Sequence, residues 1–269
     1  MGKVRSVNKP EQIYFPDHTE NDTIRFQHIT DLIFNTEKIR HGIGTLSEKT
    51  IHEVIKSFYC EDPQFQEVRT GTFIADISSG SLIVEIQNGN FNKLRDKLNE
   101  FLVQNDVIVV YPIPVEKKVY WLNQETCEIT GGRRSPHRGN RYEAFQQFYR
   151  IRSVLNHKHL HFHIFLMDME EYRLLNGWSH DKKRGSSRYD RLPGQLREIM
   201  ELNCPDDYMQ FFPPDLPELF TSKDLSKKAG IPVRLAQYCL LICRDLGIIE
   251  LSGKQGRSLQ YRLAHHTHP

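Results

Sequence analysis

The sequence of 269 residues is short of cysteine, of long hydrophobic runs and of net charge, and each shortage excludes a class of protein. The five cysteines form no C-x-x-C pair, which argues against a zinc ribbon or a disulfide scaffold and for reduced thiols. Apolar stretches such as Val107–Pro114 are far shorter than the ~20 residues that cross a bilayer. No secretory signal opens the chain. We therefore expect a cytoplasmic protein without a membrane partner.

Charge is balanced overall but unevenly distributed. Lys and Arg total 36 against 34 Asp and Glu, so general basicity gives no argument for a nucleic-acid partner. Residues 1–129 carry 14 basic and 19 acidic side chains, whereas residues 130–200 carry 14 basic and 7 acidic ones. Such a pattern suits a metal-binding centre beside phosphate-binding surfaces, and chance clustering on solvated faces is the alternative.

The order of predicted elements indicates an α/β protein. Residues 1–45 are polar and are interpreted as an N-terminal arm or cap. The following helices and strands are predicted from apolar periodicity, in chain order: helix 46–59, strands 65–69, 72–77 and 82–87, helix 90–103, strand 107–111, helix 142–155 and strand 160–167. Their order predicts a mixed sheet flanked by helices within a domain at residues 46–210.

A second, smaller domain is predicted after a proline-stiffened linker at residues 211–217. Residues 218–264 read as a short helix, a turn, a longer helix that Pro232 begins, and two strands. This order resembles a winged helix-turn-helix domain. Many such domains bind only proteins, so DNA binding and protein binding both stay open.

The winged-helix resemblance implies particular DNA contacts. The helix at residues 232–246 would approach the major groove, with Arg234 and Gln237 as candidate contacts. Lys254 and Arg257 on the wing would meet phosphates.

Asp76, Glu85 and Gln87 are the candidate catalytic residues. Side chains alternate along a strand, so Glu85 and Gln87 share one face, and Asp76 on the preceding strand can lean toward it. Two close carboxylates are costly unless a cation lies between them, and magnesium prefers such oxygen ligands. The alternative is that all three face water. The apolar neighbours of Glu85 argue against it, because they predict a buried strand.

These residues and their flanking elements resemble the PD-(D/E)xK, or restriction-endonuclease-like, nuclease superfamily, in a bacterial branch. The resemblance covers residues 46–167 and implies an αβββαβ core. It further implies that Asp76 and Glu85 hold Mg or Mn, that the carbonyl of Ile86 adds a ligand, and that Gln87 positions the nucleophile. A third acidic ligand on the first helix would be Glu48, with Glu67 as a competitor.

One residue departs from the superfamily pattern, which usually ends in lysine where this chain has Gln87. Glutamine cannot act as a base, but it can hydrogen-bond and position a water molecule. Some restriction endonucleases resemble this sequence in using glutamine there. The substitution keeps open a non-catalytic role for the domain.

Two basic, glycine-containing loops are predicted to meet DNA phosphates, although a solvated loop is the alternative. The candidate residues are Arg133, Arg134, Arg138, Lys182, Lys183, Arg184 and Arg188. Lys56, Lys117 and Lys118 are interpreted as solvated surface lysines, with contact to phosphate as the alternative.

Four histidines alternate through His157, His159, His161 and His163. Neighbouring same-face residues on a strand lie ~7 Å apart, too far for all four to reach one ion. We interpret them as the polar face of a strand near the edge of the sheet, without a metal.

The leading hypothesis is a Mg- or Mn-dependent DNA endonuclease acting on double-stranded or branched DNA, with a winged helix that helps to hold it. An enzyme that cuts both strands would be expected to act as a homodimer. The alternatives are a non-catalytic DNA-binding regulator with a nuclease-like scaffold and, third, an adaptor that binds proteins.

Overall fold

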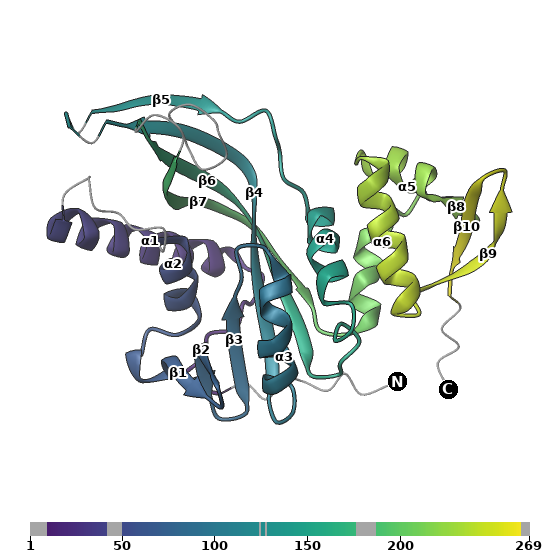
Figure 1. Ribbon diagram of the computed structural model, residues 1–269, viewed down its shortest axis with the longest axis horizontal. Coiled ribbons are helices and arrows are strands. Elements are labelled where there is room, and N and C mark those ends of the chain that lie inside the picture. The colour runs from purple at the N-terminus through teal and green to yellow at the C-terminus, as the bar shows by residue number, and fades with distance from the viewer. Residues whose placement is uncertain (1–9, 42–49, 124, 127, 176–186, 265–269) are drawn as a thin grey trace.

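The computed structural model describes residues 10–41, 50–123, 125–126, 128–175 and 187–264. Its main feature is a seven-stranded sheet in the order β1-β2-β3-β4-β6-β7, with β5 paired to the far part of β4 (Figure 1). The strands are β1 (Gln66–Thr70), β2 (Phe73–Ser79), β3 (Leu82–Ile86), β4 (Asp106–Leu122), β5 (Ile129–Arg134), β6 (Leu160–Leu174) and β7 (Ser187–Leu202). The predicted mixed α/β architecture is confirmed.

Strand directions divide the sheet into two parts. The strands β1, β2 and β3 form an antiparallel meander, and β4 then pairs with β3 in parallel. The strand β6 is parallel to β4, and β7 is antiparallel to β6. A helix connects each parallel pair, since a parallel connection must cross the sheet.

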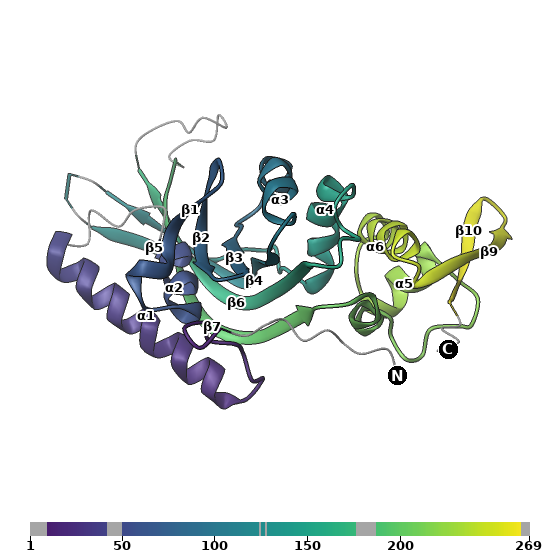
Figure 2. The ribbon, with the colours of Figure 1, turned by 90° about the horizontal axis from the view of Figure 1, so that it is seen from below.

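Helices cover both faces of the sheet (Figure 2). One face carries α1 (Glu20–His41) and α2 (Thr50–Tyr59), which pack on Val84 and Ile108. The other carries α3 (Arg95–Phe101) and α4 (Ala144–Phe148), which pack on Ile83 and Val109. Alternation along β3 and β4 therefore sends neighbouring apolar residues into two separate cores.

The helices differ from their predictions in extent. Short 3-10 helices extend α3 and α4, at Phe91–Leu94, Arg141–Glu143 and Tyr149–Ile151. The predicted N-terminal arm contains α1, a helix of 22 residues. Phe26, Ile29 and partly buried Ile33 share one face at helical spacing, while Ile24 and Leu32 are exposed. The apolar stripe is therefore short, and the exposed apolar residues obscured it in the sequence.

The prediction that a strand ends at Tyr111 was wrong, because β4 continues through Pro112 and Pro114. The peptide of Val110 points toward β3, since its carbonyl accepts from the amide of Gln87. By alternation the backbone groups of both prolines face that same side, beyond the end of β3, where no strand of the described residues pairs with this part of β4. A missing proline N–H therefore costs no strand-to-strand hydrogen bond.

The C-terminal elements are β8 (Phe220–Thr221), α5 (Ser222–Ala229), α6 (Val233–Asp245), β9 (Ile249–Gln255) and β10 (Ser258–Leu263). The three strands form a sheet in the order β8-β10-β9. Thr221 and Asp224 cap α5 reciprocally, and Gly230 ends it at a φ of 66°.

The C-terminal elements share an apolar core with the main sheet. Phe211, the first residue of the predicted linker, is buried with its ring centroid 4.7 Å from that of Phe145. Tyr238 of α6 lies 5.3 Å from Tyr149, ring to ring. The predicted linker is therefore in part a core segment.

Candidate functional site

The strands β2 and β3 separate at the candidate site. Their pairing ends at Ile77 and Val84. Just beyond, Oδ2 of Asp76 accepts a hydrogen bond of 2.7 Å from the backbone N–H of Ile86. A carboxylate thus takes the place of a strand carbonyl, and it brings Asp76 beside Glu85, the residue before Ile86.

Glu85 is buried and only partly satisfied. Its side chain is 5% exposed and forms an ion pair with Lys97 of α3 through Oε1. Its second oxygen, Oε2, is buried and has no hydrogen-bond partner among the described residues. A buried carboxylate oxygen without a partner is costly, and a cation would satisfy it.

Burial and the neighbouring charges shift the two pKa values in opposite directions. Burial and then the charge of Asp76 raise the pKa of Glu85 to about 8, against the opposing effect of Lys97. Burial alone would raise the pKa of Asp76 too, but the His52 hydrogen bond and charge, the Ile86 N–H and the charge of Lys97 lower it. Two acids that share one site oppose each other's ionisation, and here the pKa of Glu85 is the one that rises.

Lys97 and His52 are the two site residues that the sequence did not reveal. Nε2 of His52, on α2, lies 3.2 Å from Oδ1 of Asp76. The sequence carried one signal for Lys97: it lies within the apolar stripe of Leu94, Leu98 and Phe101, where a lysine is unusual. His52 follows buried Ile51 and gives no comparable signal.

Gln87 lies at the margin of this group. Its backbone N–H donates 2.9 Å to the carbonyl of Val110, which continues the pairing of β3 with β4. Its side-chain amide donates to the carbonyl of Gly89, two residues on. The predicted role for Gln87, positioning the nucleophile, stays a prediction.

The described residues include no group of three or more His, Cys, Asp or Glu side chains that could hold a metal ion. Glu48 lies outside those residues. Its predicted competitor Glu67 is exposed and pairs with Lys56 at 2.9 Å. The side chains that remain are Asp76 and Glu85. One or two carboxylates are the usual protein share of a magnesium site, with water and phosphate supplying the other ligands.

The candidate DNA-binding residues lie in several places. Arg133 and Arg134 are exposed on β5, and exposed Arg138 lies 3.5 Å from Glu116. Arg188 is the second residue of β7, and its side chain is outside the described residues, as are Lys182, Lys183 and Arg184.

The candidate contacts on the C-terminal elements are all exposed. Arg234 and Gln237 lie on α6, and Lys254 and Arg257 lie at the turn between β9 and β10. Their exposure leaves them accessible to a partner.

The prediction of a histidine-bearing strand near the sheet edge was wrong. The strand β6 lies between β4 and β7, and His161 and His163 are buried. Nδ1 of His163 lies 2.6 Å from the hydroxyl of Tyr59, and Nδ1 of His161 lies 3.2 Å from the carbonyl of Asn203. These histidines therefore make core hydrogen bonds that join α2, β6 and the end of β7.

Comparison with known proteins places the chain in a family. Residues 49–203 match a family described as a domain of unknown function, DUF8091. The chain belongs to this family. The match contains the main sheet, Asp76, Glu85 and Lys97, and it ends before the C-terminal elements.

One relative is similar over most of both chains. An uncharacterized protein of Treponema pallidum (strain Nichols) is 28% identical over 228 residues, which cover 82% of this chain and 87% of the relative. No solved structure matches the chain. Within the described residues, every helix is too short or too polar to span a bilayer.

Proposed function

We propose that this chain is a metal-dependent endonuclease that hydrolyses phosphodiester bonds in DNA. The observation that carries the proposal is the corner formed by Asp76 and Glu85, with an unsatisfied buried oxygen on Glu85 and the amine of Lys97 alongside. Nothing about core packing requires two carboxylates and a lysine at this place. Perturbed acids in such a group are typical of functional sites.

The topology around the corner supports a restriction-endonuclease-like core. A helix precedes three antiparallel strands, and a second helix leads to a fourth strand parallel to the third. This is the αβββαβ order that the sequence resemblance implies. The carboxylates lie on its second and third strands, as the resemblance also implies.

Each side chain in the corner has a role in the proposed reaction. A bound Mg or Mn ion would polarise the scissile phosphate and lower the pKa of a water molecule. Asp76 and Glu85 would hold that ion, with Asp76 fixed by Ile86 and His52. Lys97 supplies, from helix α3, the positive charge that the superfamily pattern places at the position of Gln87. Its amine would stabilise the charge that develops on the phosphate oxygens.

The C-terminal elements suit a winged helix that holds the substrate. Their order is strand, helix, turn, helix and two-stranded hairpin, and Arg234, Gln237, Lys254 and Arg257 are exposed on α6 and the hairpin. Double-stranded or branched DNA is the proposed substrate, since a helix of this kind enters a major groove.

The test is cleavage of linear and branched DNA with Mg or Mn, and with a chelator. We expect Asp76→Asn and Glu85→Gln each to reduce the metal-dependent rate by a factor on the order of 10² to 10³. The matched control is Glu67→Gln, which removes an exposed carboxylate on the neighbouring strand β1. Cleavage that survives the chelator, or that both site variants retain, contradicts the proposal.

A second candidate function is a DNA-binding regulator whose nuclease-like domain is a scaffold. Gln87 favours it, because its amide contacts the carbonyl of Gly89. Binding of the same DNA by the wild-type protein with no cleavage under any metal condition would select this function.

A further inference from the structure

The sheet continues past the catalytic corner as an arm. We define the arm as β4 from Glu116 to Leu122, β5 with the segment to Arg138, and the paired parts of β6 and β7 from residues 168–174 and 187–197. The strand β3 ends before the arm begins, opposite Val110 of β4. The arm therefore extends beyond Glu85 in the direction in which β3 and β4 run (Figure 1).

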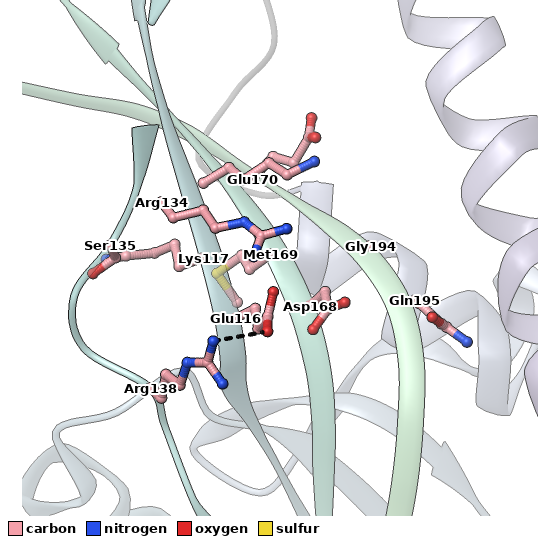
Figure 3. Close-up of a pocket in the computed structure, with 11 residues that line it drawn as sticks. Glu116, Lys117, Arg134, Ser135, Arg138, Asp168, Met169, Glu170, Gly194 and Gln195 are labelled. Atoms are coloured by element: carbon pink, nitrogen blue, oxygen red, sulfur yellow. Dashed lines mark ion pairs between the residues drawn. The ribbon is translucent and has the colours of Figure 1, made fainter. Parts of the chain in front are cut away.

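The arm contains a cavity of about 220 Å³, called here the arm pocket (Figure 3). Strand β4 lines it with Glu116, Lys117 and Lys118, and strand β6 with Asp168, Met169 and Glu170. The end of β5 and the following segment add Arg134, Ser135 and Arg138. Cationic side chains thus approach the pocket from two neighbouring strands and a loop.

The acids at the arm pocket already have partners. Asp168 binds Arg197 through two hydrogen bonds of 2.7 Å each. Glu170 accepts from the hydroxyls of Tyr120 and Tyr172, at 3.2 and 3.1 Å. Glu116 lies 3.5 Å from Arg138. Asp168 and Glu116 thus each face an arginine, whereas Glu170 keeps its negative charge, because tyrosine hydroxyls are neutral donors. One acid therefore remains beside the two cations Lys118 and Arg134.

Among the cations that line the pocket, Lys118 and Arg134 form no ion pair within the part of the chain that the structure describes. They face each other as register partners on β4 and β5, and both are exposed. Lys117 differs, because its amine lies 3.1 Å from the buried carboxylate of Glu171. Two adjacent unpaired cations repel each other, and an anion between them relieves the repulsion.

The arm pocket opens on the same face of the sheet as Glu85. Lys118 pairs with Glu170 of β6, so the two side chains share a face. Along β6, Glu170 lies four residues after Leu166, so the two side chains point to the same face. Leu166 belongs to the same apolar core as Ile83 and Val109. Glu85 shares that face, since it lies two residues after Ile83 on β3.

We infer that the arm pocket holds a phosphate of the same DNA duplex that the corner cuts, through Lys118 and Arg134. This inference rests on the proposed function. Val109 lies opposite Glu85, and Lys118 lies nine residues farther along β4. Nine strand residues span about 30 Å, which equals about nine base pairs of duplex. The arm contact therefore falls about nine base pairs to one side of the cut.

The inference is tested by binding in the presence of a chelator, so that no cleavage takes place. Fluorescence anisotropy is measured with 8- and 30-base-pair duplexes over a series of salt concentrations. The variants are Lys118→Gln, Arg134→Gln and their combination. Lys158→Gln is the matched control, because Lys158 is exposed at the opposite end of β6.

We expect the double variant to bind the 30-base-pair duplex about tenfold more weakly at physiological salt, with the slope of log K against log salt smaller by about 1.8. An 8-base-pair duplex is about 27 Å long and cannot reach both the corner and the arm, so it should show less than half of this change on the logarithmic scale. Lys158→Gln should leave both slopes unchanged.

Unchanged slopes on the long duplex overturn the arm site, even if the protein cuts DNA. An effect on single-stranded RNA with none on duplex DNA also overturns it. Reduced slopes on duplex DNA support the arm site even if the wild-type protein never cuts, and in that case only the proposed cleavage fails.

Discussion

Two buried glutamates, one in the catalytic corner and one in the arm, have opposite acidities. Glu85 is 5% exposed and Glu171 is 1% exposed in their side chains. Burial raises the pKa of Glu85 to about 8, with Asp76 adding to the effect. Burial acts on Glu171 in the same direction, but Arg173 and Lys117 lower its pKa to about 2.

The difference lies in the neighbours of each carboxylate. Glu171 lies within 3.6 Å of three cations, from Lys117, Arg173 and Arg191. Glu85 has one cation, one acidic neighbour and an oxygen without a hydrogen bond among the described residues. The first arrangement is structural, whereas in the proposed function a bound cation would complete the second. Burial alone therefore does not distinguish a functional acid from a structural one.

The largest effect on cleavage should come from removing Lys97, the ion-pair partner of Glu85. We expect Lys97→Met to reduce metal-dependent cleavage by a factor on the order of 10², because the phosphate charge loses its neighbouring amine. The loss of Lys97 also raises the pKa of Glu85 further, so the pH profile of the remaining activity should move to higher pH. Lys158→Met removes an exposed lysine just before β6; it is the control and should leave the cleavage rate unchanged. Equal rates for wild type and Lys97→Met would remove Lys97 from the reaction.

Removing the arm carboxylate should affect stability more than activity. Glu171→Gln leaves its surrounding cations without their buried partner, and we expect a loss of about 3 kcal/mol in the free energy of unfolding, measured in urea. Glu198→Gln breaks a more exposed pair with Arg141, 2.8 Å long, and should cost less than about 1 kcal/mol. A loss from Glu171→Gln no larger than that of the control would mean that the arm does not depend on its buried ion pairs.

The smallest effect concerns the pH dependence of stability in metal-free protein. The pKa of Glu85 rises from 4.5 to about 8 on folding, so the folded state retains a proton that the unfolded chain has lost. Stability from this group is fully present below about pH 4.5 and is lost as the pH rises through 8. In the wild type, the free energy of unfolding should therefore decrease between pH 6 and 9. We expect this decrease to be smaller in Glu85→Gln by one to a few kcal/mol, since one pKa unit corresponds to about 1.4 kcal/mol. Parallel curves for the variant and the wild type would show that Glu85 ionises normally.

The sequence allowed much of the sheet and the acidic pair to be predicted. Strand alternation alone predicted that Asp76 and Glu85 approach each other, and the hydrogen bond from Ile86 to Asp76 is consistent with that geometry. Lys97 was missed because its contact depends on how α3 packs on β3, which no local pattern encodes. The distance along the chain from Glu85 to Lys97 is twelve residues, and only the fold makes them neighbours.

The strand β7 was not predicted, for a different reason. This omission led to the wrong prediction about the histidines. Its pairing with β6 contains register shifts near Met167, and Pro193 and Gly194 interrupt its sequence. Each shift moves the apolar residues to the other face, so no alternation survives. Without β7, the strand that carries His161 and His163 was placed near an edge.

The hydrogen bond from Ile86 to Asp76 links the chemistry of the corner to the backbone of the sheet. Turning Asp76 toward a bound ion would draw its oxygen away from that amide, at the point where β2 has already left β3. The amide hydrogen of Ile86 would then exchange with solvent more freely than those of its neighbours in the β3–β4 ladder. The exchange rate of this one amide would therefore report whether an ion is bound between Asp76 and Glu85.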